Sequence, residues 1–301
     1  MVDSSAWKLR DAELYSELPP RFADYVGRVS GRIVGEICRL ARLRAGERVL
    51  DVGSGTGTAT VAVARRVTPG GSAVGIDYSR ERCDHARASI PSGLAIEYEF
   101  MDAEDLRFER ASFDAVVSYS AIFHFPHPER ALREMARVLA ADGRLVLTYH
   151  ATRPNTWPAR VAGSAMAAVR ALAPPFGPVL RAPDCLQSSA ETYLAKLETP
   201  AVAEWSRSGA GDKIHGWLDA VGLTVEEETW AGEEVAWDDP DEFYEAQMMI
   251  HAELRARASR SSPEARQALR LEFTQQAAQV LRRGGRLLYP FGAVCIRAAR
   301  S

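Results

Sequence analysis

An acid and three alternating glycines form a turn of the kind that binds a nucleotide. The stretch Glu-Arg-Val-Leu-Asp-Val-Gly-Ser-Gly-Thr-Gly leads from an apolar run to Asp51 and then to Gly53, Gly55 and Gly57. Glycine has no Cβ, so the chain can turn sharply after a strand and bring backbone N–H groups against a ligand. The dinucleotide pattern G-x-G-x-x-G needs a glycine where this chain has Thr58, which disfavours a nicotinamide-dependent oxidoreductase.

Two further acids follow apolar runs at the spacing of a βαβ unit. The run 72–77 ends in Asp77, twenty residues after Gly57, where such a unit presents a carboxylate to ribose hydroxyls. The run 96–102 alternates apolar and polar residues and ends in Asp102. Taken singly, each acid could instead be a helix N-cap, because a carboxylate accepts N–H groups of a first helical turn. Their order behind the glycine turn favours binding.

Four ordered elements together resemble the class I, Rossmann-like S-adenosylmethionine (SAM)-dependent methyltransferases of the small-molecule, UbiE-like (type 11) group. The fourth element is a strand at 113–118 followed by a Phe/His/Pro-rich loop, a helix and a fifth strand. The resemblance implies that SAM is bound and S-adenosylhomocysteine (SAH) released, with Tyr15 in a segment closing over the cofactor. The cofactor residues that it implies are Asp51, Gly53, Ser54, Gly55, Gly57, Asp77, Tyr78, Asp102, Ala103, Ser118 and Tyr15.

The chain length predicts one α/β core with added helical parts, because 301 residues exceed one typical domain by about half. We expect a Rossmann-like, seven-stranded, mostly parallel sheet with helices on both faces and a helical cap over the carboxyl ends of the strands. The predicted parts are a helical lid segment (1–45), the SAM-binding core (46–150), a helical cap insertion (151–210), a core helix with strand six (211–238), a second helical cap insertion (239–284) and the last core strand (285–301).

A hydroxyl acceptor would need a base, and two histidines follow strands of the predicted core. His150 comes directly after strand five, and His124 lies in the loop after strand four. Both could instead simply satisfy backbone groups. Phe123, Tyr244 and Met248 are expected to line the acceptor pocket, since the last two are four residues apart on one predicted helix and share a face.

The expected reaction is methyl transfer to a small, largely apolar metabolite, such as a quinone-like compound or a secondary metabolite, at oxygen, carbon or nitrogen. One alternative is a SAM-binding protein of this fold that catalyses a cyclisation or rearrangement without methyl transfer. The two differ in how the cap holds the substrate against the cofactor, which the sequence leaves open.

Composition narrows the partners further. A net charge of −3 without a concentrated basic face disfavours a nucleic-acid substrate. The four widely spaced cysteines and the absence of a signal-like start predict a cytoplasmic protein with reduced thiols. No metal-ligand spacing is seen, and the most apolar run, 161–180, is broken by Arg170 and prolines, so neither a metal nor a membrane span is expected. The oligomeric state is left open, with a homodimer as one option.

Overall fold

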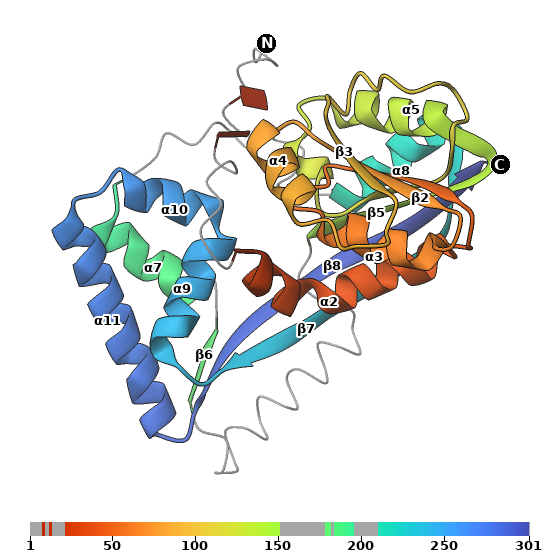
Figure 1. Cartoon of the computed structure of the whole chain (residues 1–301). Coiled ribbons are helices and arrows are strands. Elements are labelled where there is room, and N and C mark those ends of the chain that lie inside the picture. Colours follow the sequence, from red (N-terminus) through yellow and green to blue (C-terminus); the bar gives the residue numbers. More distant parts are fainter. Residues whose placement is uncertain are drawn as a thin grey trace.

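The structure is a computed structural model in which a Rossmann-like core and a helical cap are joined by two long strands (Figure 1). It describes residues 8–9, 12–13, 22–150, 178–181, 184–195 and 210–300.

The core sheet has the strand order β3-β2-β1-β4-β5-β8, and β7 pairs with the other edge of β8. The parallel strands are β1 (Arg48–Val52), β2 (Ser72–Asp77), β3 (Ile96–Phe100), β4 (Phe113–Ser118) and β5 (Leu139–His150). The antiparallel ones are β7 (Leu223–Trp237) and β8 (Arg286–Arg300). The predicted mostly parallel, Rossmann-like sheet is confirmed. Because β1 lies between β2 and β4, the order reverses there, and open α/β sheets bind ligands at the carboxyl end of such a switch point.

Helices cover both faces of this sheet, as predicted. One face is covered by α2 (Phe22–Ala41), α3 (Thr58–Val67) and α4 (Arg80–Ala88), and the other by α5 (Pro128–Val138) and α8 (Ala210–Ala220). The helical spacing of the apolar residues in α2 places Ile33, Ile37 and Leu40 on one buried stripe. Within the described residues, no helix has the length and apolar character needed to cross a bilayer.

The cap is built on the ends of β7 and β8 that reach beyond the core. It contains α7 (Asp184–Tyr193), α9 (Pro240–Ile250), α10 (Ala252–Ser259) and α11 (Pro263–Arg282), seen on the left of Figure 1. It has its own hydrophobic core, in which Phe243, Phe273 and Tyr289 are almost fully buried. The last of these comes from β8, so the same strand contributes to the cap and to the main sheet.

One short strand was not predicted from the sequence. The strand β6 (Val179–Arg181) lies in the segment expected to be a helical insertion, and it pairs parallel with the start of β8 at 286–288. Three residues are too few to show a period of two, which is why the sequence pattern gave no sign of it. The sheet therefore has eight strands within the described residues. Most of the first predicted insertion lies outside those residues, so its helical character stays a prediction.

Candidate active site

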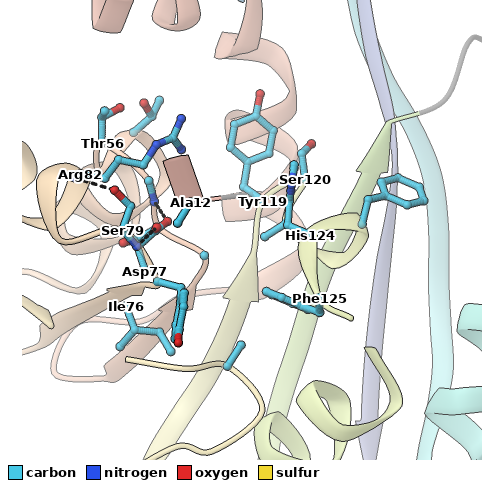
Figure 2. Close-up of a pocket in the computed structure, with 18 of the residues that line it drawn as sticks. Ala12, Thr56, Ile76, Asp77, Ser79, Arg82, Tyr119, Ser120, His124 and Phe125 are labelled. Atoms are coloured by element: carbon cyan, nitrogen blue, oxygen red, sulfur yellow. Dashed lines mark hydrogen bonds between the residues drawn. The ribbon is translucent and has the colours of Figure 1, made fainter. Parts of the chain in front are cut away.

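A cavity of about 360 Å³ lies at the carboxyl ends of the core strands and is closed on one side by the cap. Figure 2 shows Asp77, Ser79 and Arg82 on one side of it, and Tyr119 and His124 on the other. The predicted residues that line it are Gly53, Ser54, Gly55, Asp77, Tyr78, Asp102, Ala103, Phe123, His124 and His150. Lining residues that the sequence did not single out include Lys8, Arg82, Met101, Ile250 and Phe291.

The glycine turn has backbone angles and close contacts that other residues would not permit. Gly53, Gly55 and Gly57 have φ angles of 74°, 56° and 90°, in the left-handed region. A Cβ at Gly53 would lie 2.3 Å from the Cβ of Ala121, and a Cβ at Gly57 would lie 2.1 Å from the hydroxyl of Tyr98. Gly53 and Gly55 face the cavity, whereas Gly57 is the N-cap of α3 beneath it. The turn thus presents bare backbone to a ligand.

Asp77 joins the glycine turn to the next turn of the chain. Its carboxylate accepts the N–H of Gly55 at 2.8 Å and the N–H of Ser79 at 2.9 Å. The N-cap of α4 is Ser79, whose hydroxyl accepts the N–H of Arg82 at 3.3 Å. Asp77 is therefore not the cap of that helix. Each carboxylate oxygen can accept a further hydrogen bond, which suits it to two ribose hydroxyls.

Asp102 also lines the cavity, and its carboxylate forms an ion pair with Lys8. Its carboxylate accepts the N–H of Glu104 at 2.9 Å, and the Lys8 ammonium lies 2.6 Å from Asp102 and 2.9 Å from Glu104. Burial alone would lower the pKa of Lys8, but its hydrogen bonds to the two carboxylates outweigh burial and raise it. These ion pairs therefore hold Lys8 at the edge of the cavity. Tyr15, the predicted lid residue, lies outside the described residues.

Three predicted cofactor residues do not line the cavity but support it from below. Gly57 is one of them. Asp51 is fully buried, and its carboxylate accepts the hydroxyl of Thr60 at 2.6 Å. Burial raises the pKa of Asp51 to about 7, the charge of Asp77 adds to this, and the Thr60 hydrogen bond opposes it. Ser118 is also fully buried, and its hydroxyl donates to the carbonyl of Val52 at 2.9 Å, which ties β4 to β1.

The other end of the cavity is aromatic and contains His150. Phe123, Phe125 and Phe291 line this end, and the Phe291 ring lies 5.7 Å from the His150 ring. The ring of His150 opens to the cavity, and it donates a hydrogen bond to the backbone carbonyl of Gly292. The surrounding protein lowers the pKa of His150 by desolvation, and that hydrogen bond partly opposes the shift. His150 as a whole is exposed, so part of it still faces water, and the lowered pKa favours the neutral imidazole.

His124 lies on the same side as this aromatic end, in the short helix η1 (Ile122–His124). Its backbone N–H donates to the carbonyl of Ala121 at 2.9 Å, so the loop after β4 directs the side chain to the cavity.

Tyr244 and Met248 do not line the cavity, contrary to the prediction. Both are on α9, as expected, but they face the core of the cap: the Tyr244 ring packs 5.9 Å from the Phe273 ring, and Met248 packs against the same cluster. Ile250, at the carboxyl end of α9, lines the cavity instead. The four-residue spacing correctly placed the two side chains on one face, but it could not say which neighbour that face meets.

The residues around the cavity fit SAM. The glycine cradle leaves room beside bare backbone, the two carboxylates suit hydroxyl and amino donors, and the volume is in the range of about 300–1,000 Å³ that small-molecule sites have. With its strand order and its switch-point cavity, the fold is that of the class I methyltransferases.

Comparison with known families gives the same class. Residues 50–147 match the family described as "Methyltransferase domain". Residues 50–147 therefore form a methyltransferase domain.

Two curated relatives illustrate the match. The demethylmenaquinone methyltransferase of Clavibacter sepedonicus is 36% identical over 110 residues, which are 36% of this chain and 44% of that protein. The ubiquinone biosynthesis O-methyltransferase of Xanthomonas axonopodis pv. citri is 37% identical over 127 residues, 41% of this chain and 52% of that protein. The chain spans about half or less of the length of the curated relatives that it matches.

A crystal structure from Bacillus halodurans, whose name assigns it provisionally to the methyltransferases, has the same fold. It superposes with a TM-score of 0.51 at 20% identity, over 88% of this chain and 97% of that one. At this identity the likeness supports the fold alone.

Proposed function

We propose that the protein transfers a methyl group from SAM to a small, largely apolar acceptor and releases SAH. One observation carries the proposal: a single cavity joins the glycine turn, Asp77 and Asp102 at one end to an aromatic compartment with His150 at the other. A cofactor and an acceptor held in these two parts would meet inside one cavity, which the cap closes on one side. Methyl transfer is an in-line displacement, so it depends on such alignment and on exclusion of water.

The residues at the cofactor end would bind and orient. Backbone N–H groups of the glycine turn would face the methionine part of the cofactor, Asp77 would accept the ribose hydroxyls, and Asp102 would accept the adenine amino group. SAM, when bound, supplies a methyl group on a positively charged sulfur. Phe123, Phe125 and Phe291 would keep water from the acceptor.

His150 is the proposed base for a hydroxyl acceptor. Its N–H is held by the carbonyl of Gly292, which leaves the other ring nitrogen to accept the proton of the acceptor hydroxyl. Its lowered pKa keeps that nitrogen unprotonated at neutral pH. As the oxygen forms its bond to the methyl group, the bond from sulfur to that methyl breaks and the proton moves to His150. His124 is a second candidate on the same side.

A planar, quinone-like or phenolic acceptor fits the aromatic end best. Flat rings stack or meet edge to face with Phe123, Phe125 and Phe291 at little entropic cost. The names of the two curated relatives, which refer to menaquinone and ubiquinone, support the same class. Oxygen is the acceptor atom of this proposal, because an unprotonated imidazole can accept the proton of a hydroxyl group.

The experiment is a mass-spectrometric search with methyl-labelled SAM and an apolar metabolite extract. We expect a product heavier by one labelled methyl group, formed in equal amount to SAH. His150→Ala should lower the rate of the chemical step by about 10²–10⁴-fold while SAH affinity stays near that of the unmodified protein. The control is His85→Ala, an exposed histidine on α4. Appearance of an isomerised product without SAH would instead mean a rearrangement, and methyl transfer would be excluded.

A further inference from the structure

A partly buried hydrogen bond within the cap connects the junction of α9 and α10 to β8, close to the acceptor end of the cavity. His251 separates α9 from α10, and its Nε2 lies 2.9 Å from the hydroxyl of Tyr289 on β8. His251 makes no side-chain capping bond to α10, so its ring is committed to this contact instead. Tyr289 is 1% exposed, which makes its hydroxyl a deeply buried partner. Neither residue belongs to the proposed cofactor site.

This pair is adjacent in sequence to two residues that line the cavity. Ile250 precedes His251, and Phe291 follows Tyr289 by two positions, so the two aromatic side chains leave the strand on the same face. The ring centres of Tyr289 and Phe291 are 6.2 Å apart, and those of Phe291 and His150 are 5.7 Å apart. A row of aromatic rings therefore runs from the junction of α9 and α10 to the proposed base.

We propose, on the basis of the acceptor site proposed above, that His251 and Tyr289 are positioning residues that fix the acceptor end of the cavity. Their hydrogen bond holds Ile250 and Phe291 in place beside His150. The bond thereby fixes the α9–α10 junction against β8 where the cap meets the acceptor. Loss of the bond would loosen this wall and leave the cofactor end, at the glycine turn, unchanged.

The charges around the pair are consistent with a neutral hydrogen bond. Burial, together with the nearby His150 and Arg255, lowers the pKa of His251 to about 4. Burial raises the pKa of Tyr289, and the neighbouring Tyr119 adds to this. At neutral pH both partners are therefore uncharged, and a buried neutral pair avoids the cost of desolvating a charge.

The test removes the hydroxyl without changing the ring. Tyr289→Phe should weaken binding of 2-naphthol, a planar phenolic probe read by its fluorescence, about three- to tenfold, with SAH affinity within about twofold of the unmodified protein. If 2-naphthol is methylated, its KM should rise more than its kcat falls. The matched control is Tyr193→Phe, another cap tyrosine, whose hydroxyl donates to Glu272 far along α11.

A second measurement does not depend on any acceptor. Titration of the histidine ring signals by NMR should show a changed pKa of His150 in Tyr289→Phe, because the Phe291 ring, whose centre lies 5.7 Å from that of His150, is loosened. His251→Gln keeps a hydrogen-bond acceptor for Tyr289 and should stay closer to the unmodified protein than His251→Leu does. These two variants also serve if Tyr289→Phe fails to fold.

The outcomes separate the pair from the proposed function. Unchanged His150 titration in Tyr289→Phe, or an equal loss of 2-naphthol and SAH affinity, would overturn the positioning role. An unmodified protein that binds SAH but not 2-naphthol would contradict the phenolic acceptor, and the His150 titration would still decide the role of the pair.

Discussion

Asp51 should make the stability of the ligand-free protein fall as the pH rises, and Asp51→Asn should remove that fall. Its pKa rises from 3.8 to about 7 on folding, a difference of about 3 units, and each unit is worth about 1.4 kcal/mol. The folded state therefore keeps a proton that the unfolded state has already released. The contribution of Asp51 is fully favourable below pH 4 and is lost progressively until pH 7, by about 4 kcal/mol in total.

The assay is urea unfolding of both proteins, without SAM, at several pH values between 4 and 8. Asparagine can still accept the Thr60 hydroxyl, so any difference in packing adds an offset that does not change with pH. As the pH rises from 4 to 8, the free energy of unfolding of Asp51→Asn should therefore increase by about 4 kcal/mol relative to that of the unmodified protein. Asp142→Asn, on an exposed aspartate, is the control. A constant difference between Asp51→Asn and the unmodified protein would refute the reasoning.

Three further predictions concern the cofactor end. Gly57→Ala should destabilise the fold by more than the ~1–2 kcal/mol of left-handed strain alone, because its Cβ meets the buried Tyr98, whereas thermal unfolding of Gly55→Ala should show little beyond that strain. Equal losses in the two variants would contradict this contact. Asp77→Asn should weaken SAH binding in calorimetry by about 1–3 kcal/mol, and unaltered affinity would remove it from the site. Lys8→Met should speed SAH release in stopped-flow measurements, since it removes the ion pairs that hold Lys8 against Asp102 and Glu104 at the cavity; an unchanged rate would exclude that role.

The glycine turn and its acids could be found from the sequence because their signals are local. Gly53 and Gly55 have left-handed backbone angles that favour glycine, and Asp77 follows at a distance fixed by one helix and one strand. The alternation and length of the apolar runs likewise predicted the order of the core elements. For these parts, short-range physics determines where a residue lies.

The acceptor end could not be found in this way, because its residues come from distant parts of the chain. Phe291 and Ile250 reach the cavity through the pairing of β8 with β5 and the break between α9 and α10, and neither carries a local signal. Tyr244 is the opposite case. Its spacing from Met248 predicted that it would line the pocket, but its side chain packs in the hydrophobic core of the cap. Ser118 was placed correctly at a strand end, but its side chain bonds to Val52 rather than facing the cavity.

Calorimetric titration of the unmodified protein with SAH tests the cofactor site most directly. The site predicts one binding event per chain, competition by SAM, and strong weakening in Asp102→Ala, whose side chain faces the cavity. NAD, which shares the adenosine part but lacks the methionine part, should bind far more weakly. A folded protein that gives no heat with SAH, or that binds NAD as tightly as SAH, would contradict the assignment of this cavity to SAM.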